Sequence, residues 1–140
     1  MNKPQAHIRI DFTEGCSIGP GKIALLEGIG RTGSLSAAAR ALGMSYRRAW
    51  LLLHSINDAF SHAAVELSIG GRDGGGARVT EFGTQLIRSY RDFETAVDAL
   101  AVKSFASYRP TRATKLLEPT RMRRPVSRSL ARTPAKSPKK

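Results

Sequence analysis

Residues 32–50 read TGSLSAAARALGMSYRRAW, and this stretch decides the fold. Its first half places apolar side chains at i, i+3, i+4 and i+7 from Leu35, which predicts one buried face of a short helix. Ser34 suits the N-cap of that helix, and Gly43 suits its C-terminal cap. Ser45 then suits the N-cap of a further helix after a tight turn, so the stretch predicts a helix-turn-helix. The buried face of the further helix is expected to hold Ala49, Leu53, Ile56 and Phe60.

The flanking sequence adds a strand and a helix before this stretch and a hairpin after it. Apolar residues alternate at positions 8, 10 and 12, which predicts a short strand, and residues 22–30 have helical spacing. Residues 65–69 alternate again, five glycines fall within residues 70–76, and extended structure resumes at residues 77–79. This pattern predicts a glycine-tipped β-hairpin. The expected fold class is therefore mainly α, a winged helix-turn-helix with a short strand and a hairpin wing.

A long last helix is expected from Thr80 to about residue 105. Its apolar side chains follow spacings of 4, 3, 4 and 3, which is the heptad seam of a coiled coil. About two and a half heptads are too few to be stable alone, and they suit pairing with the same helix of a second copy. The expected dimerisation residues are Leu86, Tyr90, Phe93, Val97 and Leu100.

The net charge of +12 is concentrated near one end of the chain. Residues 1–102 hold 11 Lys and Arg against 10 Asp and Glu, whereas residues 103–140 hold 12 Lys and Arg against Glu118 alone. Repeated prolines and few apolar residues predict disorder from about Tyr108. The expected division is a domain of residues 1–107 and a basic tail of residues 108–140. Its Ser/Thr-Pro-basic runs look like those of linker-histone tails, and its charge favours salt-sensitive, sequence-independent binding to DNA.

The start of the second helix of the helix-turn-helix is the expected DNA-reading site. Tyr46, Arg47 and Arg48 form its first exposed turn, and arginine forks bind guanine O6 and N7 or clamp phosphate. Glycines at the hairpin tip let the backbone approach DNA closely. Trp50 is expected in the core rather than at the edge of the DNA-reading face. The expected DNA-binding residues are Ser34, Ser36, Ser45, Tyr46, Arg47, Arg48, Arg72, Gly74, Gly75, Gly76 and Arg78.

Three motifs resemble a known family. GPGKIALLE (19–27), TGSLSAAARALGMSYRRAW (32–50) and GGGARVT (74–80) look like the N-terminal DNA-binding domain of the molybdate-responsive ModE regulators. The run GSLSAAARAL is shared with LysR-type DNA-binding domains, whereas SYRRAW together with the triple glycine is narrower. The resemblance covers about residues 6–105. It implies a homodimeric winged-helix repressor or activator joined through its long last helix, with residues 45–48 at the major groove and residues 74–78 at the wing.

One departure from the family pattern changes the expected function. ModE regulators that sense molybdate carry a C-terminal pair of small β-barrel domains that bind the oxyanion, and residues 108–140 have no strand pattern. We therefore expect no molybdate site in this chain. Sensing would come from a separate oxyanion-sensing or other regulatory protein, or would not exist.

Several other classes of function are disfavoured by the sequence. The single Cys16 excludes an internal disulfide framework, no apolar run is long enough to span a bilayer, and no secretory leader is visible. His54, Asp58 and His62 have i, i+4, i+8 spacing, but the helix is expected to fray near Phe60, so we expect no metal site. No catalytic motif fits, and we expect neither an enzyme nor a cofactor.

The expected function is a sequence-specific DNA-binding transcriptional regulator in the cytoplasm, associated with the nucleoid. The expected partners are double-stranded DNA and a second copy of the chain. Two alternatives stay open from the sequence. One is an architectural nucleoid protein whose tail dominates binding, and the other is a regulator module that acts through a separate effector-binding partner.

Overall fold

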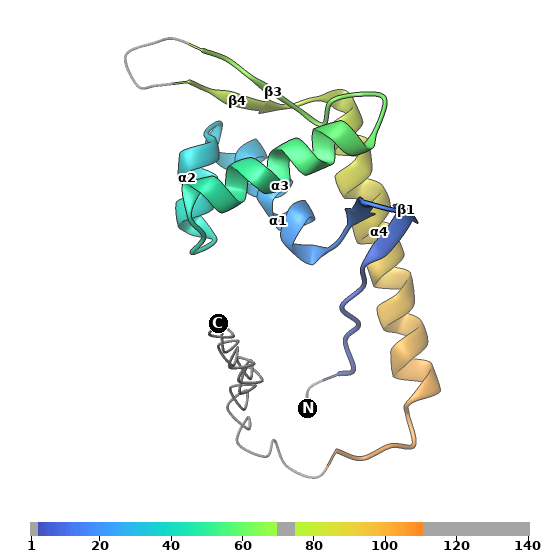
Figure 1. Cartoon of the computed structure of the whole chain (residues 1–140). Helices are drawn as coiled ribbons and strands as arrows, with labels where there is room; N and C mark the ends of the chain where they lie inside the picture. Colours follow the sequence, from blue (N-terminus) through green and yellow to red (C-terminus); the bar gives the residue numbers. More distant parts are fainter. Residues whose placement is uncertain (1–2, 70–74, 111–140) are drawn as a thin grey trace, which may run out of the picture. The chain divides into compact units, whose positions relative to one another are not determined.

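The computed structural model describes residues 3–69 and 75–110 (Figure 1). Contacts divide the chain into Met1–Ser107 and Tyr108–Lys140, and the description below concerns the first unit. The elements in chain order are β1 (Ile10–Thr13), β2 (Cys16–Ile18), α1 (Pro20–Thr32), α2 (Leu35–Ala41), α3 (Tyr46–Ala59), β3 (Val65–Leu67), β4 (Ala77–Val79) and α4 (Glu81–Ser104).

Helices α1 to α3, followed by the antiparallel β3–β4 hairpin and then α4, form a winged helix-turn-helix, as predicted. The predicted disorder of the tail falls almost wholly on residues 111–140, which lie outside the described residues.

The helix boundaries follow the capping residues that the sequence indicates. Ser34 accepts a hydrogen bond from the Ala37 N–H at 3.2 Å, and Ser45 accepts one from the Arg48 N–H at 3.2 Å. Between α2 and α3, Gly43 has φ of +65°, a left-handed conformation that a side chain would strain. The tight turn of the helix-turn-helix is thus defined by contacts between residues close together in the sequence.

The core is centred on α1. Ile23, Leu25, Leu26 and Ile29 are all 0% exposed, and α2, α3, α4 and β4 all pack against this helix. Each fully buried aliphatic side chain of this size stabilises the fold by about 1.5–3 kcal/mol. A Cβ on Gly28 of α1 would lie 3.2 Å from the Ala38 Cβ, so the small residues let α1 and α2 approach closely.

The N-terminal region differs from the single strand that the sequence predicts. Strand β1 begins at Ile10 and pairs antiparallel with β2. The alternation at positions 8, 10 and 12 does not indicate this second strand. Gly15, with φ of +76°, makes the turn between them, and Ile18 of β2 is 3% exposed. Helix α1 also begins two residues earlier than predicted, at Pro20, because proline suits the first helical position.

Helix α4 is fastened to the rest of the unit through Tyr90 and Arg91. The Tyr90 hydroxyl donates to the Ile8 carbonyl oxygen at 2.7 Å, and the N-terminal segment runs beside α4 (Figure 1). Arg91 bridges Glu27 of α1 at 2.6 Å and Glu94 of α4 at 2.7 Å. The hydrogen bonds to Glu27 and Glu94 raise the pKa of Arg91 above its ordinary value.

The assignment of Tyr90 to a dimer seam is wrong. Its side chain is 1% exposed within a single protomer, and this burial raises the pKa of its hydroxyl. Leu86 is also partly buried against the same core. Both residues follow the heptad spacing, but that face of α4 packs against the core of the same protomer.

No helix in the described part of the chain is long and apolar enough to cross a membrane.

Replacing Gly83 by alanine should destabilise the fold by about 1–3 kcal/mol, because there is no room for a side chain. A Cβ at this position would overlap the Ala64 carbonyl oxygen and lie 2.8 Å from Val79 Cγ1. Gly21→Ala is the matched control, since nothing lies within 4 Å of a Cβ there. Urea unfolding followed by circular dichroism measures both. Equal midpoints for Gly83→Ala and Gly21→Ala would show that α4 does not pack this closely against the α3–β3 loop.

Candidate nucleic-acid interface

Helix α3 has one buried face and one exposed face. Ala49, Leu53 and Ile56 are each 0% exposed in the core that α1 organises. The opposite face begins with Tyr46, which is 56% exposed, followed by the exposed Arg47. Arg48 is exposed as well, so the structure presents the whole predicted first turn to the surroundings.

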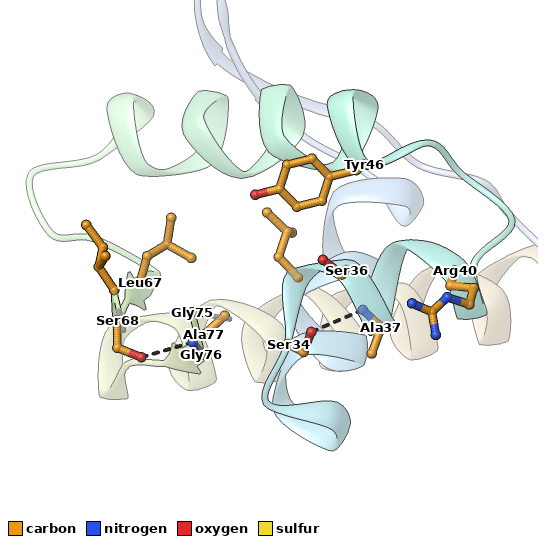
Figure 2. Close-up of a pocket in the computed structure, with 12 residues that line it drawn as sticks. Ser34, Ser36, Ala37, Arg40, Tyr46, Leu67, Ser68, Gly75, Gly76 and Ala77 are labelled. Carbon is orange, nitrogen blue, oxygen red and sulfur yellow. Dashed lines mark hydrogen bonds between the residues drawn. The ribbon is translucent and has the colours of Figure 1, made fainter. Parts of the chain in front are cut away.

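A hollow of about 530 Å³ lies between the start of α2, the start of α3 and the inner side of the β3–β4 hairpin (Figure 2). We call it the wing hollow. Tyr46 lies on its α3 side, and Arg40 lines it from α2. Its other lining residues are Ser34, Leu35, Ser36, Ala37, Leu67, Ser68, Ile69, Gly75, Gly76 and Ala77. The wing hollow therefore brings together residues that the sequence assigned separately to the helix-turn-helix and to the wing.

The β3–β4 hairpin is held in a fixed relation to the helix-turn-helix. The Ala77 N–H donates to the Gly33 carbonyl oxygen at 2.9 Å, which ties β4 to the junction of α1 and α2. Within the hairpin, the Ser68 hydroxyl accepts from the Gly76 N–H at 3.1 Å, and a Cβ on Gly75 would overlap the Ser68 carbonyl oxygen. Glycine is thus required where the two strands end, next to the tip of the wing.

Among the predicted wing residues, Arg78 has a partner that the sequence reasoning missed. It lies opposite Glu66 in the strand register, and the two side chains form a salt bridge. Their side chains are 72% and 60% exposed, so the pair contributes no more than about 1 kcal/mol and a phosphate can compete for the guanidinium. The predicted Arg72 and Gly74 lie outside the described residues.

Trp50 does not lie in the core, and that expectation was wrong. Its side chain is 41% exposed on α3, and its ring lies against the His54 ring with centroids 3.8 Å apart. The neighbouring Leu51 is 51% exposed. The sequence held only part of this signal. With Ala49, Leu53 and Ile56 buried, positions 51 and 54 lie on the other side of the helix, whereas Trp50 lies at the edge of the buried face.

The possible metal ligands on α3 do not converge. Helix α3 ends at Ala59, so His62 lies beyond it, where its Nδ1 is 3.2 Å from the Ser61 hydroxyl. Within the described ranges, no three His, Cys, Asp or Glu side chains form a group that could hold a metal ion. Cys16 is buried and donates from Sγ to the Ala59 carbonyl oxygen at 3.4 Å, which is a packing role.

The second half of α4 keeps an apolar edge after the core has been formed. Phe93 is 45% exposed and Leu100 is 60% exposed, whereas Val97 between them is partly buried. Phe93 and Leu100 are two helical turns apart, so they lie on one line along the helix.

The fold and this surface define a class of protein, the winged helix-turn-helix proteins. No family model matches the chain. The molybdenum-pterin-binding protein MopB of Rhodobacter capsulatus is 43% identical over 86 residues, which are 61% of this chain and 32% of MopB. MopA of the same organism, also described as molybdenum-pterin-binding, is 40% identical over 107 residues, 76% of this chain and 40% of MopA.

A third relative is the DNA-binding transcriptional dual regulator ModE of Escherichia coli K12. It is 41% identical over 71 residues, which are 51% of this chain and 27% of ModE. The chain is therefore homologous to the ModE and Mop proteins, which confirms the resemblance seen in its motifs. It spans about two fifths or less of the length of these relatives.

Proposed function

We propose that the protein is a DNA-binding transcriptional regulator that reads duplex DNA with α3. The observation that carries this proposal is the exposed first turn of α3, with Tyr46, Arg47 and Arg48 beside the wing hollow. Homology to a DNA-binding transcriptional regulator supports it. The nearly balanced charge of residues 1–102 makes the placing of these arginines, rather than bulk charge, the basis of specificity.

Each part of the surface has a distinct role in this proposal. Arg47 and Arg48 enter the major groove with α3 and contact base edges or phosphate, while Tyr46 hydrogen-bonds phosphate. The hydroxyls of Ser34 and Ser36 face the backbone from α2. The hairpin, with Gly75 and Gly76 next to its tip and Arg78 in β4, contacts the adjacent phosphates or minor groove.

The chain acts as a homodimer in this proposal, and α4 joins the two copies. Of the predicted seam residues, Phe93 and Leu100 are exposed and Val97 is partly buried, whereas Tyr90 is buried in the protomer. A two-fold protein then reads two half-sites related by the same symmetry. The tail, residues 108–140, adds sequence-independent grip through counterion release. The proposed location is the cytoplasm, at the nucleoid.

The Mop relatives are described as binding a molybdenum pterin, and this suggests a second candidate function. We assign DNA binding to this chain, because the exposed first turn of α3 supports that function directly. Any response to an oxyanion then belongs to a separate regulatory protein. Co-purification of such a partner from the source cell would identify the effector.

Replacing Arg47 by alanine should lower sequence preference rather than overall affinity for DNA. A duplex selected from a randomised pool by the unmodified protein supplies the specific site, and a scrambled duplex supplies the reference. The ratio of their binding constants should fall about 5- to 150-fold, because a bidentate arginine–guanine contact is worth about 1–3 kcal/mol.

Arg88→Ala is the control for this measurement, since it removes the same charge from an exposed position on α4. It should leave the ratio unchanged. A ratio that stays the same in Arg47→Ala would refute the reading role of α3. Failure of the selection to enrich any sequence would favour the architectural alternative.

Deletion of residues 109–140 should weaken binding equally for selected and scrambled duplexes. The deletion removes 11 of the 23 Lys and Arg residues. If half of them neutralise phosphates, the slope of log K against log salt becomes shallower by about 5. Fluorescence anisotropy at several potassium chloride concentrations measures this slope. A loss confined to the selected duplex would instead assign the tail to base recognition.

Replacing Leu100 by glutamate should raise the dimer dissociation constant at least tenfold, because a charge would enter the proposed α4 contact. Sedimentation velocity over a range of protein concentrations measures this constant. Ala99→Glu places the same charge on the neighbouring exposed position, outside the line of Phe93 and Leu100, and should have little effect. Equal masses for the unmodified protein and Leu100→Glu at every concentration would refute dimerisation through this edge.

A further inference from the structure

The exposed face of α3 carries large apolar side chains beyond its first turn. Trp50 is 41% exposed and Leu51 is 51% exposed, although the core of the same helix is completely buried. Single exposed apolar residues are common on proteins, but here two are adjacent and the ring of His54 continues the surface. The fold itself does not require them, because Ala49, Leu53 and Ile56 already anchor α3.

The charges around this apolar patch favour DNA as its occupant. Leu51 follows Arg47 by one helical turn and Trp50 follows Tyr46 by one turn, so the patch continues the proposed reading surface. The sequence from residue 46 to residue 57 contains no acidic residue. Asp58 is exposed seven residues after Leu51, and its carboxylate would repel phosphates. The face that can approach DNA therefore ends before Asp58, after about three turns.

We propose that Trp50 and Leu51 read thymine methyl groups in the major groove. This inference rests on the proposed function and extends it to base pairs beyond the reach of Arg47. The thymine C5-methyl is the apolar feature that the major groove offers, and apolar side chains distinguish it from cytosine. With an arginine and two apolar side chains along one helix, the recognised DNA sequence would contain a guanine position followed by thymine positions.

His54 acts as a positioning residue for the indole. The two rings are tilted by 41° with centroids 3.8 Å apart, so the imidazole restricts the orientations that Trp50 can take. An indole held in this way loses less conformational entropy when DNA binds than a freely rotating one would.

The test removes individual methyl groups from the DNA rather than atoms from the protein alone. A duplex selected from a randomised pool by the full chain is resynthesised with deoxyuridine in place of each thymine in turn. Binding of the unmodified protein should weaken about three- to fourfold at one or two positions, which is the value of one buried methyl group. Trp50→Ala or Leu51→Ala should bind the thymine and deoxyuridine duplexes equally at those positions.

Phe12→Ala is the matched control. Phe12 is a 50% exposed aromatic residue that packs against Phe60 from the N-terminal hairpin, away from α3's exposed face. This variant should keep the full three- to fourfold effect. Because Trp50 is the only tryptophan in the chain, its fluorescence gives a second readout that needs no substitution. Its emission should change more on binding the thymine duplex than on binding the critical deoxyuridine duplex.

The possible outcomes separate this inference from the function on which it rests. Sequence-specific binding with no loss on methyl removal, or with the same loss in Trp50→Ala and Leu51→Ala as in the unmodified protein, overturns methyl reading alone. Failure of the chain to prefer any duplex overturns both proposals. Loss of the methyl effect in the two α3 variants, with its retention in Phe12→Ala, establishes the readers.

Discussion

The contact between α3 and α1 constrains everything else in the structure. Ala49, Leu53 and Ile56 must be buried against the aliphatic side chains of α1, and a helix has 3.6 residues per turn. When these positions are buried, the helix geometry places Arg47 and Leu51 on the opposite, exposed side. The same packing that stabilises the fold therefore exposes the proposed reading face and fixes its orientation.

The two halves of helix α4 have different surroundings. Its first half is committed to the protomer through the buried Tyr90 and through Arg91, which joins α1 to α4. Its second half passes beyond the core and keeps Phe93 and Leu100 exposed. Because the fastening lies next to the exposed edge, a dimer formed there would hold the two reading helices at a fixed separation, which half-site spacing requires.

Local signals in the sequence were sufficient for the framework of the fold. Ser34, Ser45 and Thr80 cap the helices that they were expected to cap, since a cap depends only on atoms within three residues. Strand β2 was missed, whereas β3 and β4, also of three residues each, were predicted because the glycines of residues 70–76 marked those two as a hairpin. The sequence motifs were also sufficient to indicate the family.

The errors at the candidate site have one physical cause. Periodicity shows that a residue lies on a face, but it does not show which other element covers that face. Tyr90 fits a heptad seam, yet its hydroxyl donates a hydrogen bond to the Ile8 carbonyl oxygen of the N-terminal segment. Trp50 was assigned to the core from its residue type, although the helix period places it only at the edge of the buried face. Likewise, the Glu66–Arg78 pair depends on strand register, which the hairpin sequence alone left open.

The division of charge gives the last constraint on how such a protein would search DNA. With 11 basic and 10 acidic residues in positions 1–102, the folded unit has little long-range attraction to DNA, and its contacts act only at close range. In the proposed function, the basic residues after position 102 act at longer range and without sequence preference. Non-specific binding and base recognition would then be carried by different parts of one chain. A change in salt then alters how long the chain stays on DNA more than it alters which sequence it prefers.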